Sequence, residues 1–375
     1  MHSRLMVAGA TLTAVTALSG ALPAEAAPRP PAPTATTLQQ APNPAFDVLQ
    51  PSGTPLPLRV NPRQLSVTYT YEGKQHTLDS YLARTGTQGF VVLDGQDIVM
   101  ERYSFATRDT RFQSWSVAKS FTSAAFGIAL DEGHIDSIDD PVTKYLPELR
   151  GSGYDGVSLL NVLRMSSGVT WNEVTDVPPV HVAASLGYPL PKLAAARVRG
   201  WEPGSRFNYT SMNSFVLGWV IARATGTPYH EYVEKKLWKP AGMESSAHLG
   251  NDSNGNSMAY CCYYATSRDF ARFGLLFLRD GTAAGRQVVP GPWVKESTRP
   301  SSTTYPGYGL HWWIWGNDGS YAAEGLGGQK IYVSPKHGVV IAKNQLAALA
   351  GDNETEAAFE ALAAEVARTR PSRQR

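Results

Sequence analysis

Cysteine is nearly absent from this chain. The 375 residues include two cysteines, Cys261 and Cys262, and these are neighbours. An ordinary disulfide needs its two Cα atoms farther apart than adjacent residues allow, so a bridge between neighbours is strained. The sequence therefore predicts no disulfide framework. It favours two small buried thiols, with a nucleophilic cysteine as the alternative.

Blocks of like charge and metal-binding spacings are also missing. The 34 basic and 32 acidic residues give a net charge of +2 and are spread along the chain, so nucleic acid is not an expected partner. Neither His-Glu-x-x-His nor Cys-x-x-Cys occurs, so the sequence predicts no metal site and no cofactor. A composition of 42% hydrophobic and 18% charged residues is that of a globular protein with a large core.

The chain opens with the pattern of an export signal. Arg4 precedes a run of apolar or small residues from 5 to 22, and Ala24-Glu25-Ala26 matches a small-residue cleavage site. We therefore predict a signal peptide over residues 1–26, cleaved after Ala26, and a secreted protein.

A membrane anchor is the alternative interpretation of the same run. Gly20, Pro23 and the lack of a basic stop after the run favour export, so no stable membrane anchor is expected. The following residues, 27–45, are rich in proline, alanine and threonine, and this composition predicts a disordered spacer.

Strand patterns lie at both ends of the mature chain. Two apolar runs between Gly89 and Met100 flank an Asp-Gly turn, which predicts a hairpin. Alternating or apolar runs with turns between them, from 308 to 344, predict an antiparallel meander, and a helix is expected from Asp352 to Thr369.

Helical patterns fill the middle of the chain. Prolines between Trp171 and Trp201 instead predict an irregular wall or lid over a site. The expected helices start at Ser116, at Leu159 with Ser158 as N-cap, at Asn213 or Ser214, at Tyr229, and after a capping box at Thr266.

These patterns predict an α/β (α+β) fold. We expect one domain over residues 46–370, with a sheet part at about 60–130 and 290–370 and a mostly helical part at about 130–290. The simplest assembly is a sheet built from the two ends of the chain, into which the helical part is inserted.

Ser116 and Lys119 are the first candidates for chemistry. Residues i and i+3 share a helix face, so the lysine amine can lie beside the serine oxygen. A serine needs an adjacent base to become a nucleophile, and a lysine whose pKa is lowered by burial can be that base. A serine N-cap followed by a solvated lysine is the alternative interpretation.

The other parts of an acyl-transfer site also have candidates. Tyr209 lies in a polar loop before a helix, where its phenol can shuttle a proton, and a neighbouring lysine cation is expected to lower its pKa. The backbone N–H of Ser116 and one from the glycine-flanked strand Glu324-Gly325-Leu326 are the candidates for an oxyanion hole.

The order of these motifs resembles that of the serine β-lactamase and penicillin-binding-protein superfamily. The chain looks like the class C-like branch, with its 6-aminohexanoate-dimer hydrolases and esterases, from about Phe90 to Asn344. The connecting landmarks are Leu163 to Gly168, Pro203-Gly204, Trp238 to Met243 and Ala265 to Gly274.

The resemblance implies a β-lactamase/transpeptidase-like fold and a role for each motif. It makes Ser116 the nucleophile, Lys119 its base, Tyr209 the proton shuttle and Leu326 the donor of the second oxyanion N–H. The expected substrate-binding residues are Trp171, Tyr188, Ser211 and Gly325.

Two positions depart from the antibiotic-binding pattern. Ser211 stands where class C β-lactamases have asparagine. Ala323-Glu324-Gly325 lacks the cation that holds an antibiotic or peptide carboxylate, and Glu324 is expected to repel one.

We therefore expect a secreted serine hydrolase that cleaves a small-molecule amide or ester through an acyl-enzyme. A β-lactamase or D,D-peptidase is the alternative enzyme, and a catalytically silent penicillin-binding-like sensor is the alternative of another class. The sequence predicts no oligomeric state.

Overall fold

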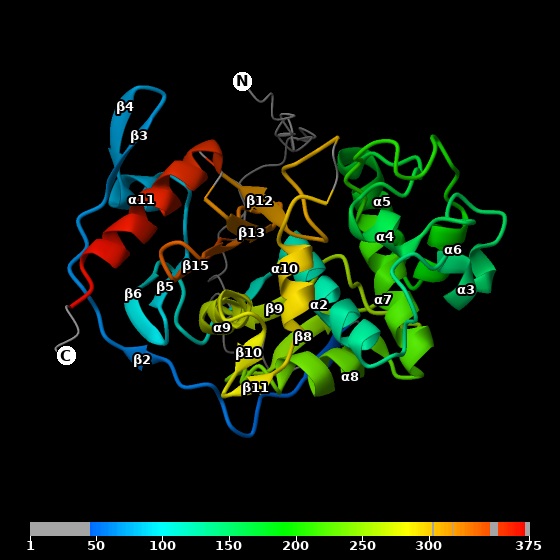
Figure 1. The fold of residues 1–375 in the computed structure, drawn as a ribbon, viewed down its shortest axis with the longest axis horizontal. Helices are drawn as coiled ribbons and strands as arrows, with labels where there is room; N and C mark the ends of the chain where they lie inside the picture. The colour runs from blue at the N-terminus through cyan, green and yellow to red at the C-terminus, as the bar shows by residue number, and fades with distance from the viewer. Residues whose placement is uncertain (1–45, 302–303, 317, 346–351, 372–375) are drawn as a thin grey trace, which may run out of the picture. The chain divides into compact units, whose positions relative to one another are not determined.

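The computed structural model describes residues 46–301, 304–316, 318–345 and 352–371 (Figure 1). The predicted signal peptide, 1–26, and the predicted spacer, 27–45, lie outside these residues. Among the helices in the described ranges, none combines the length and the apolar character needed to span a membrane.

A seven-stranded sheet joins the two ends of the chain. Its strand order is β12-β13-β14-β15-β5-β6-β2. Strand β15 (Val339–Asn344) pairs antiparallel with β5 (Gly89–Asp94) along its whole length, so the late meander extends the early hairpin directly. The predicted sheet built from both ends is confirmed. The other strands are β2 (Arg59–Val60), β6 (Asp97–Tyr103), β12 (Trp313–Trp315), β13 (Ser320–Glu324) and β14 (Lys330–Ser334).

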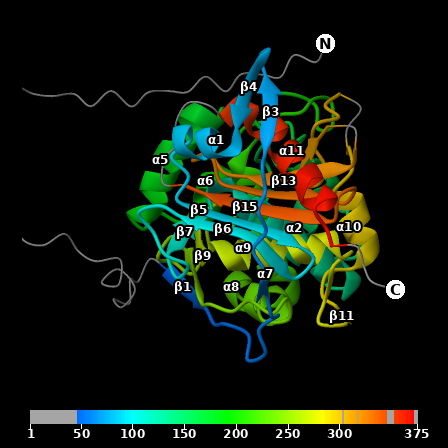
Figure 2. The same cartoon turned by 90° about the vertical axis from the view of Figure 1, so that its left-hand side faces the viewer.

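Helices cover both faces of this sheet (Figures 1 and 2). Alternate residues of β15 point to opposite sides: Ile341 packs with α11 (Thr355–Arg368), whereas Val340 packs with α9 (Ser267–Leu278). Helix α9 lies close to the sheet because Gly274 has no side chain; a Cβ there would lie 2.5 Å from Val340 Cγ1. The face under α9 belongs to the larger core, which continues into the helical part.

A second, four-stranded sheet lies beside the site and was not predicted. Its order is β1-β8-β9-β7. Its strands are β1 (Phe46–Leu49), β7 (Arg111–Gln113), β8 (Ala247–Gly250) and β9 (Tyr263–Thr266). Strands β8 and β9 fall in the stretch expected to be mostly helical. They are four residues each, too short to show a strand period above the surrounding sequence.

Most helices of the middle region match their predicted positions. Helix α2 (Ala118–Asp131) follows Ser116, and Ser158 caps α4 (Leu159–Leu163) by accepting from the Asn161 N–H. Helix α7 (Ser211–Thr225) ends at Gly226, whose φ of +64° is the left-handed conformation expected of a C-terminal glycine. Helix α8 (Tyr229–Val233) starts where a helix was predicted, and α3 (Val142–Tyr145) also lies in this region. Helices α1 (Leu78–Arg84) and α10 (Gly291–Ser297) lie outside it and were not predicted.

The prediction of an irregular stretch between Trp171 and Trp201 is wrong. It contains α5 (Glu173–Ser185) and α6 (Leu190–Ala195). The side chain of Asn172 caps α5 by accepting from two backbone N–H groups. Pro178 and Pro179 are exposed, so the carbonyls they leave without a helical partner can face solvent. Pro191 lies in the first turn of α6, where proline is tolerated.

Candidate active site

Ser116 lies in a 3-10 turn, η2 (Trp115–Val117), between β7 and α2. Ser114 fixes the start of this turn: its N–H donates to Tyr263 O at 2.7 Å, and its Oγ accepts from the Tyr263 N–H at 3.1 Å. Trp115 has φ +45°, which is unusual for a bulky residue and brings a sharp change of chain direction before the serine. Ser116 remains partly exposed, in contrast to the buried Val117 that follows it.

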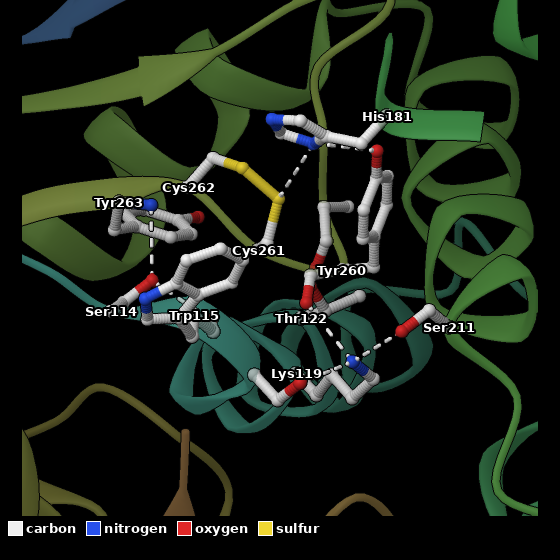
Figure 3. Close-up of a disulfide and its surroundings, with 12 residues drawn as sticks. Ser114, Trp115, Lys119, Thr122, His181, Ser211, Tyr260, Cys261, Cys262 and Tyr263 are labelled. Atoms are coloured by element: carbon white, nitrogen blue, oxygen red, sulfur yellow. Dashed lines mark hydrogen bonds between the residues drawn. A yellow bond between two sulfur atoms is a disulfide. The ribbon is translucent and has the colours of Figure 1, made fainter. Parts of the chain in front are cut away.

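Lys119 is buried one turn further along, with 1% of its surface exposed. Its Nζ donates to Ser116 Oγ at 2.8 Å. It also donates to Ser211 Oγ at 2.9 Å and to Tyr260 O at 3.1 Å (Figure 3). Burial lowers the pKa of Lys119 to about 8, although the negative charge of Glu173 acts in the opposite direction. At pH 7 about a tenth of the amine is therefore neutral, against less than about a thousandth for a lysine at its ordinary pKa of 10.5, so a base for Ser116 is available near neutral pH.

Tyr209 lies in the loop that leads into α7, beside the lysine. Lys119 Nζ is 5.0 Å from the centre of its ring. The ring stacks on Trp313 at 5.4 Å and meets Tyr308 edge-on at 6.0 Å. A hydrogen bond with Ser116 links the phenol to the candidate nucleophile.

The expected lowering of the Tyr209 pKa is wrong. Burial among aromatic rings raises the pKa of Tyr209 well above its ordinary value, and the negative charges of Glu173 and Glu324 raise it further. The hydrogen bond with Ser116 lowers it by a smaller amount. Tyr209 is therefore a protonated phenol, which can donate a proton but is not a resting base.

Glu173 is a site residue that the sequence interpretation missed. Its carboxylate accepts from the Ser211 N–H at 3.0 Å, from the Ser211 hydroxyl, and from Trp171 Nε1 at 2.6 Å. A chain of hydrogen bonds thus runs from Glu173 through Ser211 to Lys119 and Ser116. The sequence does contain a signal for a helix here. Asn172 is a good N-cap and Glu173 gives the helix an acidic first turn, but both lie in the stretch predicted to be irregular.

The predicted substrate-binding residues differ in their burial and in their contacts with the candidate catalytic residues. Ser211 is 3% exposed and contacts the lysine. Trp171 is 5% exposed, and its indole N–H is taken by Glu173. Tyr188 is 49% exposed in the turn between α5 and α6. In the described part of the chain, no hydrogen bond or ring contact joins Tyr188 to the serine, the lysine or Tyr209.

The late glycine segment reaches the nucleophile turn, but Leu326 is not on a strand. Strand β13 ends at Glu324, and Leu326 lies in the turn to β14. Gly325 packs directly against the start of the nucleophile turn: a Cβ there would lie 2.6 Å from Ser114 O. Among the described residues, no acceptor is bonded to the N–H of Leu326. The N–H of Ser116 lies in a first helical turn, where backbone N–H groups have no intrahelical acceptor. The oxyanion role of these two N–H groups stays a prediction.

Glu324 is held by two neighbours. Its carboxylate accepts from Lys330 Nζ at 3.0 Å and from Trp315 Nε1 at 2.6 Å. Lys330, 4% exposed in its side chain, compensates the negative charge, so the repulsion of a substrate carboxylate is weaker than the sequence suggested.

The two cysteines are joined to each other beside this site. Cys261 and Cys262 form a disulfide, and both are buried (Figure 3). The prediction of two separate thiols is therefore wrong. Cys262 takes a φ of +78°, in the left-handed region that residues other than glycine rarely adopt.

A serine and a lysine one helical turn apart, facing a tyrosine beside an antiparallel sheet, are the arrangement of serine hydrolases with the β-lactamase/transpeptidase-like fold. The comparisons with known proteins agree. The chain belongs to the Beta-lactamase family, whose family model matches residues 74–365. It is accordingly a hydrolase of amide or ester bonds.

Individual relatives support the same family. The chain is 33% identical over 292 residues to 6-aminohexanoate-dimer hydrolase of Paenarthrobacter ureafaciens, which covers 71% of this chain and 74% of the relative. A solved Bacillus anthracis protein assigned to the same hydrolases has a TM-score of 0.77 at 22% identity, over 86% of this chain and 90% of that one. A D-stereospecific amidohydrolase from Streptomyces sp. has a TM-score of 0.58 at 25% identity, over 76% and 96%.

Proposed function

We propose that this protein cleaves amide bonds, and esters by the same route, through a covalent acyl-enzyme on Ser116. The contact that carries the proposal is the 2.8 Å approach of Lys119 Nζ to Ser116 Oγ in a buried setting. The relatives point to the amide class, since one is named a 6-aminohexanoate-dimer hydrolase and another an amidohydrolase.

During acylation, Lys119 accepts one proton and Tyr209 donates another. The neutral Lys119 amine takes the Ser116 proton as Oγ attacks the substrate carbonyl. The N–H groups of Ser116 and Leu326 hold the developing oxyanion. The Tyr209 phenol then gives its proton to the leaving nitrogen or oxygen, which leaves a phenolate beside the Lys119 ammonium.

Deacylation restores the starting state. The Tyr209 phenolate takes a proton from the attacking water, and the Lys119 ammonium returns its proton to the departing Ser116 oxygen. The raised pKa of Tyr209 suits this role, because the phenolate exists only between the two steps and is a strong base when water must be activated.

The β-lactamase and D,D-peptidase alternatives need a cation for the substrate carboxylate. Ala323-Glu324-Gly325 supplies none, and Lys330, which begins the neighbouring strand β14, is compensated by Glu324 at 3.0 Å. This pairing favours substrates without a carboxylate at that position. The silent-sensor alternative has no support in the site, where the serine, lysine and tyrosine lie in contact.

A fluorophosphonate probe tests the nucleophile. The mature protein should be labelled at Ser116, and Ser116→Ala should abolish labelling and lower hydrolysis by at least about 10³-fold. Ser205→Ala, which changes an exposed serine, is the matched control. Labelling that persists in Ser116→Ala would overturn the assignment.

A substrate panel then separates the alternatives. Values of kcat/KM for amides and esters should exceed the value for a chromogenic cephalosporin. Faster turnover of the cephalosporin would favour the β-lactamase alternative, and acylation without turnover would favour the sensor.

We also propose that the chain is exported and cleaved after Ala26. The support is the pattern of Arg4, the apolar run at 5–22 and the cleavage motif. N-terminal sequencing of the protein recovered from the medium of a secreting bacterial host should begin at Ala27, and an uncleaved cell-bound product would contradict it.

A further inference from the structure

One group of metal-ligand side chains lies outside the catalytic machinery in the described ranges. His181, Cys261 and Cys262 each offer a ligand atom, and these atoms lie within 4.8 Å of one another. His181 Nδ1 is 4.0 Å from Cys261 Sγ (Figure 3). The histidine belongs to α5 and the cysteines to the segment before β9, so the group joins two elements that are 80 residues apart in sequence.

We propose that reduction of the Cys261–Cys262 disulfide opens a binding site for a soft divalent cation such as Zn²⁺. Two thiolates and an imidazole nitrogen are the ligand types that zinc prefers. Tetrahedral zinc, with bonds of about 2.3 Å to sulfur and 2.0 Å to nitrogen, holds its ligand atoms roughly 3.5–3.8 Å apart. Breaking the sulfur–sulfur bond frees both cysteine side chains to rotate, and the 4.0 Å from His181 Nδ1 to Cys261 Sγ is already close to these values.

A small dithiol or a phosphine is the reductant that breaks the Cys261–Cys262 bond. It supplies two electrons to the sulfur–sulfur bond, and two protons complete the thiols. The cation then displaces those two protons as it binds the thiolates. Water can complete a four-coordinate shell, as in zinc sites with three protein ligands.

The three candidate ligand residues lie mostly below the protein surface. Cys261 and Cys262 are 4% and 2% exposed, and His181 is partly buried. The Tyr260 hydroxyl lies 3.5 Å from His181 Nδ1, and its ring meets the imidazole edge-on. A low-dielectric wall of this kind strengthens the attraction between a cation and its thiolate ligands.

The site also adjoins the environment of the lysine. Helix α5 carries Glu173 at its start and His181 two turns later, and the carbonyl of Tyr260, next to Cys261, accepts from Lys119 at 3.1 Å. A cation between α5 and the cysteine segment would thus join the helix whose Glu173 bonds Ser211 to the segment whose Tyr260 carbonyl bonds Lys119. The binding proposal itself does not rest on the hydrolase function.

The experiment compares oxidised and reduced mature protein. Each is titrated with Zn²⁺ by calorimetry and with Co²⁺ by its thiolate charge-transfer absorption, after thiol counting confirms the redox state. We expect 1:1 binding to the reduced protein and none to the oxidised protein. His181→Ala should weaken binding by at least about 100-fold, and the double variant C261S/C262S should abolish it.

The controls separate this proposal from the catalytic one. His134→Ala removes a surface histidine, with a side chain 40% exposed, and should bind like the parent. Ser116→Ala should also bind normally, so a failed hydrolase assignment would not affect the result. Reduced protein with two free thiols that binds no cation, or binds it equally well in His181→Ala, would overturn the proposal. Unfolding on reduction, seen by circular dichroism, would overturn it too, because the site needs the native segment.

Discussion

Glu173 and Lys119 are connected through one hydroxyl group. Ser211 Oγ donates to the Glu173 carboxylate and accepts from Lys119 Nζ at 2.9 Å. The carboxylate therefore acts on the lysine from outside its hydrogen-bonding distance, and its charge raises the pKa of the amine that burial lowers. The balance of these two effects sets the pH range in which Lys119 can act as a base.

The first prediction concerns Glu173→Gln. Removing the negative charge removes the influence that raises the Lys119 pKa, so the neutral amine persists to lower pH. The acid limb of kcat/KM against pH, expected near 8 in the parent, should therefore move to lower pH. Glu231→Gln changes a carboxylate that is 61% exposed and should leave the limb in place. A limb that is unchanged or moves upward in Glu173→Gln would contradict the coupling.

The second prediction concerns Lys119→Met. The methionine fills a buried place without a charge or a lone pair strong enough to take the serine proton. We expect kcat/KM to fall by about 10²–10⁴-fold, the usual contribution of a general base. The midpoint of urea unfolding should not fall at neutral pH, because a buried amine is replaced by an apolar group of similar length. Activity within tenfold of the parent would assign the base elsewhere.

The third prediction concerns Tyr209→Phe. The ring and its stacking on Trp313 stay, and only the phenol is lost. Hydrolysis of amides, whose leaving nitrogen must be protonated, should fall by about 10²–10⁴-fold. An activated aryl ester, whose leaving group departs without a proton, should lose much less in acylation, as measured by the burst of the released phenol. Equal losses for both substrates would argue against a proton donated by Tyr209.

The fourth prediction concerns Gly325→Ala. The new Cβ would lie 2.6 Å from Ser114 O and 2.6 Å from Gln329 Oε1, so the turn must move away from the nucleophile. If the Leu326 N–H is an oxyanion donor, kcat should fall by about 10²–10³-fold while KM changes little. Gly53→Ala, with open space around the added methyl group, is the control. An active Gly325→Ala enzyme would remove Leu326 from the mechanism.

The parts of the fold that the sequence predicted have strong local signals. The runs in β5, β6, β14 and β15 are long and apolar, and the helices α4 and α9 begin at Ser158 and Thr266, whose side chains cap them. The second sheet lacks such a signal because its strands are short. Helix α5 was missed because proline was given more weight than the Asn172 cap.

The parts of the site that were missed depend on three-dimensional neighbours. The raised pKa of Tyr209 comes from burial and from two carboxylates that lie 36 residues before it and 115 residues after it in the chain. The contact of Glu173 with Ser211 spans 38 residues, and that of His181 with Cys261 spans 80. Spacing along the chain carries no information about such contacts.

The pairing of β15 with β5 has a consequence for when the enzyme can become active. Strand β5, at residues 89–94, can pair with β15 only after residues 339–344 have been synthesised. Gly325, which contacts Ser114, also lies in the last part of the chain. Contacts so far apart in sequence form slowly. A chain still emerging from the ribosome therefore carries Ser116 and Lys119 without their late partner, and hydrolytic activity should arise only once the whole polypeptide has been synthesised and released.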